Sequence, residues 1–147
     1  APAMGLTPGR QFELRAWRHL STPAAQTDAH RHNLGVLMLH DARLIDGLAL
    51  QVHIANVARD RLPRRRLAHT DILARTLPRV RCPVHAIYGA CDAVYGPYVD
   101  RLDGAFAASA PEFRGLQRIE GAGHWVPFEA PAAFDAALRR ALNPAPE

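Results

Sequence analysis

The first half of the chain has a hydrophobic pattern that is typical of helices. Between residues 43 and 62, apolar side chains recur every three or four positions, so they share one helix face. These positions are Ile45, Leu48, Ala49, Val52 and Ala55. The same pattern predicts helices over 14–20, 33–41, 43–62 and 72–77, the last of them capped by Thr70-Asp71 and ended by Pro78. We expect residues 1 to about 78 to contain no strand.

From residue 79 onwards, short apolar runs alternate with helical patterns. The predicted order is a strand over 84–89, a helix over 98–109, a strand over 116–121 and a helix over 131–142. Pro131 suits the first turn of the last helix, and Asn143-Pro144 ends it. Because this alternation is the pattern of βαβ units, we expect an α/β fold class with a parallel sheet.

The predicted sheet is small for its type. Parallel strands are normally buried on both faces of a larger sheet, and two strands alone are marginally stable. We therefore expect the chain to be the C-terminal portion of a longer protein, or to pair with a segment of another chain. The alternative is a complete small domain.

Composition limits the class of protein. The chain has 147 residues and 48% hydrophobic content, enough for a domain with a buried core. It contains no apolar stretch of membrane-spanning length, and its first residues lack the pattern of a signal peptide. Cys82 and Cys91 flank a predicted strand without metal-site spacing, so we expect free thiols and a cytoplasmic location.

The charge of the chain gives little information about its binding partners. The net charge is +4, and all eighteen basic residues are arginine, which we attribute to genome composition. The run RDRLPRRR at 59–66 could contact phosphate, but it lacks interleaved aromatic residues, and we interpret it as a solvated helix end. DAHRH at 28–32 lacks further ligands at metal-site spacing and is interpreted as a polar helix start. We expect no metal, cofactor, nucleic acid or membrane partner.

Candidate chemistry lies just after the two predicted strands. Asp92 follows the first strand and His124 follows the second. A right-handed crossover would bring the two loops together at the carboxyl edge of the sheet, where α/β proteins place functional sites. A carboxylate that accepts the Nδ1 proton would fix the imidazole tautomer and leave Nε2 to act as a base.

Simpler roles for these residues stay open. His124 could be a structural turn residue, and Asp92 could cap a turn. Asp100 and Asp103 are alternative acids, but both fall in a predicted helix that points away from the loop.

The segments CPVHAIYGACDAVYG and LQRIEGAGHWVPFEAPAAFDAALRRAL resemble the C-terminal section of the α/β-hydrolase superfamily over residues 80–142. The resemblance implies a partial α/β-hydrolase fold: a helical cap followed by the last two parallel strands and their flanking helices. Residues 1–78 would be the cap region, and residues 79–147 the C-terminal part of the core, without the N-terminal half of the sheet. The chain order nucleophile, acid, histidine implies that Asp92 is the triad acid and His124 the base.

Within the superfamily, GHW with Phe128 and Glu129 is most similar to meta-cleavage-product hydrolases, which cut carbon-carbon bonds. That similarity implies that Trp125 lines the substrate pocket and that an arginine from the cap binds substrate. The corresponding helix carries His53, Asn56 and Arg59, among which the sequence does not choose. Epoxide hydrolases, haloalkane dehalogenases and esterases have similar C-terminal motifs.

The nucleophile is not in this sequence. It has no Gly-x-Ser-x-Gly motif, and its only serines, Ser21 and Ser109, do not lie at a strand-to-helix elbow. We expect the chain alone to be inactive, and its partner to be a missing N-terminal segment or a second copy. Three hypotheses follow: part of a serine-type hydrolase of a small apolar ester or vinylogous diketone acid, a relative with an aspartate nucleophile, or a non-catalytic binding module.

Overall fold

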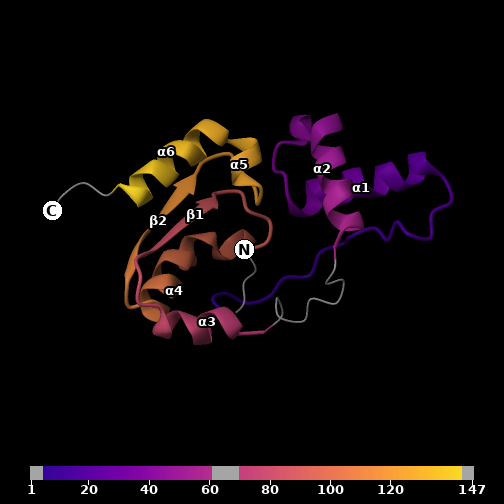
Figure 1. Cartoon of the computed structure of the whole chain (residues 1–147). Coiled ribbons are helices and arrows are strands. Elements are labelled where there is room, and N and C mark those ends of the chain that lie inside the picture. The colour runs from indigo at the N-terminus through magenta and orange to yellow at the C-terminus, as the bar shows by residue number, and fades with distance from the viewer. Residues whose placement is uncertain (1–4, 61–69, 144–147) are drawn as a thin grey trace.

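The computed structural model describes residues 5–60 and 70–143 (Figure 1). In chain order the elements are α1 (Pro23–Leu37), a 3₁₀ turn (Ala42–Leu44), α2 (Gly47–Ala58), α3 (Ile72–Thr76), a 3₁₀ turn (Leu77–Arg79), β1 (Val84–Gly89), a 3₁₀ turn (Gly96–Arg101), α4 (Leu102–Ser109), β2 (Phe113–Ile119), α5 (Val126–Glu129) and α6 (Pro131–Leu142). Among these residues, no helix is both long enough and apolar enough to cross a bilayer.

The two strands lie side by side and parallel, as predicted. Gly89 is level with Ile119 at their carboxyl ends, and α4 makes the crossover between them. Figure 1 shows α6 on one face of this sheet and α4 on the other. Among the described residues, β2 is the only strand beside β1, so the opposite edge of β1 is open.

Alternation along β1 divides the core into two layers. Ala86 and Tyr88 point into the cluster shared with α4, whereas Ile87 packs with the cluster beneath α6. The α4 side contains Leu77, Ala86, Tyr88, Tyr95, Val99, Leu102, Phe106 and Ala110, and the α6 side contains Ile119, Ala122, Val126 and Ala137. Both faces of the sheet are therefore covered, which positions the loops that follow its strands.

Helices α1 and α2 pack against each other and form a separate unit, here called the helical pair (Figure 1). Thr22 caps α1 by accepting the Ala25 amide at 3.2 Å, and Asp46 caps α2 by accepting the Ala49 amide at 2.9 Å. Their shared core is Leu34, Leu39, Ala49 and Leu50, against which Trp125 and Phe128 also pack. The helical pair is thus attached to the sheet unit through the segment that follows β2.

The structure corrects several predicted elements. Residues 14–20 are not a helix, because the Asn33 side chain bonds both the amide and the carbonyl of Arg15, at 2.7 and 2.9 Å, in place of helical partners. Helix α1 begins at Pro23, so DAHRH at 28–32 lies inside it and is not a helix start. Pro78 lies within a 3₁₀ turn that continues α3.

The other predicted elements either have the observed ends or differ from the structure by a few residues. The predicted strand 84–89 and the predicted helix 131–142 are confirmed, whereas the strand predicted at 116–121 covers 113–119. Helix α2 ends at Ala58, and most of the arginine run at 59–66 lies outside the described residues. Helix α5 was not predicted.

Candidate active site

The loops that follow β1 and β2 are held together by main-chain hydrogen bonds. The amides of Ala90 and Cys91 donate to the carbonyls of Ile119 and Ala122, each at 2.9 Å. This close approach depends on Gly89, where a Cβ atom would lie 2.2 Å from the carbonyl oxygen of Ala122. The parallel pairing therefore continues past the strands and fixes the spacing of the two loops.

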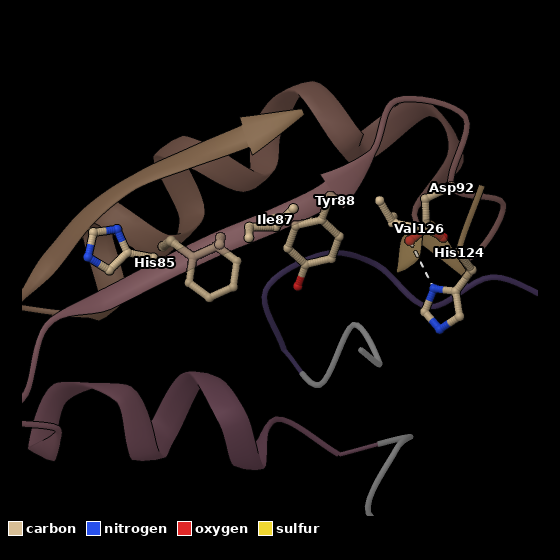
Figure 2. Close-up of a pocket in the computed structure, with 8 residues that line it drawn as sticks. His85, Ile87, Tyr88, Asp92, His124 and Val126 are labelled. Carbon is tan, nitrogen blue, oxygen red and sulfur yellow. Dashed lines mark hydrogen bonds and ion pairs between the residues drawn. The ribbon is translucent and has the colours of Figure 1, made fainter. Parts of the chain in front are cut away.

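Asp92 and His124 meet at this edge, as the sequence predicted. Asp92 Oδ2 lies 2.9 Å from His124 Nδ1 (Figure 2). Asp92 Oδ1 accepts the amide of Val94 at 2.8 Å. Asp92 is only 2% exposed, whereas the His124 side chain is 18% exposed. The turn amide fixes the carboxylate, and the carboxylate in turn selects the His124 tautomer with a proton on Nδ1.

The alternative acids are directed elsewhere. Asp100 is exposed and forms an ion pair with Arg118, and Asp103 is exposed on α4. Neither is among the contacts of His124 that the structure shows. Asp92 is therefore the carboxylate that can act with His124.

A cavity of about 230 Å³ lies beside this pair (Figure 2). Four consecutive residues of β1 line it, together with the pair and two residues from helices: His85, Ala86, Ile87, Tyr88, Asp92, Phe106, His124 and Val126. Because successive strand side chains point to opposite faces, a cavity that touches four in a row lies along a strand edge. The β2 side of β1 is occupied, so this cavity follows the open edge of β1.

Two buried tyrosines lie near the pair. The hydroxyls of Tyr88 and Tyr95 are 3.4 Å apart, and their rings meet edge to face. Burial raises the pKa of both phenols, with the nearby Asp92 carboxylate acting in the same direction. Both therefore stay neutral at physiological pH.

Trp125 lies between the sheet unit and the helical pair. Its amide donates to the Met38 carbonyl at 2.9 Å, and its ring centroid is 6.3 Å from that of His53 and 6.0 Å from that of Phe128. The structure thus places Trp125 against the helical pair, next in the chain to His124. Its role in lining a substrate pocket stays a prediction.

The sequence did not assign a role to Glu129. Its Oε1 accepts the amides of His40 and Asp41 at 2.7 and 2.9 Å, and its Oε2 accepts the amide of Gly123. The sequence shows Glu129 five residues after His124. It does not show that Glu129 binds the amides of residues 40 and 41, because these are far away in the sequence.

The sequence also did not reveal a row of rings that includes one histidine from each helix of the helical pair and a tryptophan at either end. Trp17, His30, His53 and Trp125 follow one another with centroid separations of 4.6, 5.2 and 6.3 Å. His30 is 1% exposed, and neither ring nitrogen has a hydrogen-bond partner among the described residues. Burial lowers the pKa of both histidines; Arg18 adds to the effect at His30, and His30 adds to it at His53. The sequence DAHRH does not show that His30 is the buried residue, because its polar neighbours give no sign of which side chain faces the interior.

The described residues contain no group of three or more His, Cys, Asp or Glu side chains that could hold a metal ion. Cys82 and Cys91 are free thiols.

No protein-family model and no curated protein sequence matches the chain. Solved structures do match it. Naproxen esterase, a carboxylesterase from Bacillus subtilis, is similar at a TM-score of 0.57 and 17% identity over 79% of this chain and 41% of that one. The meta-cleavage product hydrolase CumD from Pseudomonas fluorescens IP01, in complex with acetates, is similar at a TM-score of 0.61 and 15% identity, over 94% of this chain and 53% of that one.

Both CumD structures are of mutants, and the second, of a different mutant, gives a TM-score of 0.60 at 15% identity over 88% of this chain and 48% of that one. The chain therefore spans about half the length of these proteins, or less. Identities of this size show a common fold and leave the reaction open. This protein has a partial α/β-hydrolase fold, as its sequence predicted.

Proposed function

We propose that this chain is the part of an α/β-hydrolase that supplies the acid and the histidine of a nucleophile-acid-histidine triad. The observation that carries the proposal is the 2.9 Å contact between the buried Asp92 carboxylate and His124 Nδ1, at the carboxyl ends of adjacent parallel strands. Structural similarity to an esterase and to carbon-carbon hydrolases supports the reaction class.

In this mechanism Asp92 keeps the Nδ1 proton on His124, so Nε2 is the nitrogen that works as a base. Nε2 takes the proton of a nucleophilic hydroxyl group while the oxygen of that hydroxyl attacks the carbonyl carbon of the ester. The buried Asp92 carboxylate stabilises the imidazolium that results. Nε2 then returns the proton to the leaving alcohol as the carbon-oxygen bond breaks, and a water molecule releases the acyl group by the same route.

The nucleophile has to come from outside this sequence. The open edge of β1, with the cavity that ends at Asp92 and His124, is where we propose that a strand of a nucleophile-bearing segment pairs. That segment would also supply the backbone amides that stabilise the oxyanion. The 147-residue chain alone should then be inactive, and an incoming strand would cover an edge otherwise prone to association.

We propose a small apolar ester or a vinylogous diketone acid as the substrate. The named reactions of the structural neighbours support this class. Ile87, Phe106 and Val126 give the cavity an apolar part, beside the polar groups of His85, Asp92 and His124. In this proposal the helical pair is the cap, and Trp125 forms the boundary between the cap and the site. The free cysteines agree with the cytoplasmic location that we propose.

The test compares hydrolysis of p-nitrophenyl butyrate by the 147-residue chain and by the longer protein encoded with the reading frame upstream of Ala1. We expect turnover only in the longer protein, with a kcat loss of about 10³- to 10⁴-fold in Asp92→Asn or His124→Ala. Asp103→Asn is the matched control, because it removes the same charge from an exposed site on α4.

Two results would contradict the proposal. One is turnover by the 147-residue chain that disappears in His124→Ala. The other is a longer protein whose activity survives both Asp92→Asn and His124→Ala.

A further inference from the structure

We propose that Glu129 is a positioning residue that joins the helical pair to the loop of His124, so that the seating of the helical pair sets the position of the histidine. The inference rests on the proposed role of His124 as the base. It concerns a contact that the triad itself does not require.

Three backbone amides donate to the Glu129 carboxylate, from two distant segments. His40 and Asp41, in the connection that follows α1, donate to Oε1 at 2.7 and 2.9 Å, and Gly123 donates to Oε2. Hydrogen bonds to an ionised carboxylate are stronger than those between neutral groups. One side chain therefore holds the α1 connection and the residue before His124 at the same time.

Main-chain contacts reinforce this junction on the other side of His124. The amide of Trp125 donates to the Met38 carbonyl at 2.9 Å. His124 thus lies between two residues, Gly123 and Trp125, that are each bonded at the junction with the α1 connection, one through Glu129 and one directly. Movement of residues 38–41 would pull on both neighbours of the histidine.

The junction is tightly packed at Gly123. A Cβ atom there would lie 2.8 Å from both Glu129 Oε2 and the His40 nitrogen, and 3.1 Å from the Met38 oxygen. Such distances leave no space for a side chain, so the loop and the α1 connection are in direct contact.

The contacts of Glu129 are not those of a local helix cap. Glu129 lies in the single turn of α5, whose N-cap is Trp125, whereas a capping carboxylate there would accept the N-cap amide, which instead donates to Met38. Two of its three donors are 88 and 89 residues away in sequence. The contacts of Glu129 therefore join two parts of the fold.

The Glu129→Gln substitution distinguishes the hydrogen bonds to the α1 connection from the hydrogen bond to Gly123. The amide oxygen of glutamine can still accept from His40 and Asp41, but its NH₂ group would face the Gly123 amide, a donor against a donor. We expect hydrogen exchange of the Gly123 amide to accelerate about 10- to 100-fold, from the loss of a hydrogen bond to a charged acceptor. The His40 and Asp41 amides should keep most of their protection.

The decisive readout is the hydrogen-bonded Nδ1 proton of His124 in NMR spectra of the 147-residue chain, with the ring ¹⁵N shifts that report its tautomer. We expect the proton signal to broaden or disappear in Glu129→Gln and in Glu129→Ala, although Asp92 is unchanged. The matched control is Glu120→Gln, which removes the same charge from an exposed residue at the start of the same loop. It should leave the signal intact.

If Glu129→Ala does not fold, Glu129→Gln alone decides. A folded Glu129→Gln variant with unchanged Gly123 exchange and an unchanged His124 signal would overturn the inference, even if its melting temperature fell. Failure of the proposed function looks different, because the activity of the longer protein would then survive Asp92→Asn and His124→Ala, whatever the Glu129 variants do to the His124 signal.

Discussion

Replacement of His30 by leucine should stabilise the chain. A neutral imidazole has one donor and one acceptor nitrogen, and both ring nitrogens of His30 are buried without a partner among the described residues. Each such group costs about 1–3 kcal/mol. Leucine removes both costs but loses the ring contacts with Trp17 and His53, worth about 0.5–1.5 kcal/mol each. The midpoints of these ranges, about 4 kcal/mol removed and about 2 kcal/mol lost, give a net gain of about 2 kcal/mol at pH 7.5.

The gain should grow in acid. The folded-state pKa of His30 is lowered below its ordinary value of 6.5 by burial and by Arg18, so folding favours the neutral ring. The unmodified chain therefore keeps this part of its stability above about pH 6.5 and loses it as the pH falls through that value towards the folded pKa. His30→Leu removes this loss, although His53, whose pKa is also lowered by burial, keeps a loss of its own.

Urea unfolding at pH 7.5 and pH 5.5 would measure both effects. Trp17 and Trp125, the only tryptophans in the sequence, flank the two histidines, so intrinsic fluorescence follows this region. His19→Leu, at an exposed position, is the control and should change neither value. The reasoning is refuted if His30→Leu is less stable at pH 7.5, or if its advantage does not widen at pH 5.5.

Two further substitutions test the frame around the site. Gly89→Ala should destabilise the chain by about 1–3 kcal/mol in thermal melts, because the new Cβ atom would lie 2.2 Å from main-chain oxygens. It should also disturb the contact between Asp92 and His124. The control is Gly104→Ala on α4, which has open space around it and should be neutral or stabilising. Asp46→Ala should cost about 1 kcal/mol by circular dichroism, from the lost cap of α2. Asp71→Ala should cost less, because Asp71 makes no capping hydrogen bond, and an equal loss would contradict the capping argument.

The parts of the fold that local sequence determines were predictable. The run VHAIYG has the apolar, β-branched character of a buried strand, and Pro131 marks a helix start, so 84–89 and 131–142 were predicted with their observed bounds. The meeting of Asp92 and His124 followed from the handedness of the crossover between parallel strands. The bounds of these elements and the meeting of the two side chains depend on residues that are close together in the sequence.

The parts that depend on distant contacts were not predictable. Residues 14–20 have a helical pattern, but the side chain of Asn33 bonds their backbone. His30 looks like one polar residue among several until α1 is packed against Trp17 and α2. Glu129 was visible as part of a motif, and only the folded chain brings it to the amides that follow α1.

The junction at Glu129 also has a consequence for the order of assembly. The contact between Asp92 and His124 closes 32 residues, whereas the contact between Glu129 and His40 closes 89. Loop closure over the longer span costs about 1 kcal/mol more in chain entropy. The strand-helix-strand unit can thus bring the histidine to its carboxylate early in folding, and the helical pair then arrives to lock a site that is already paired.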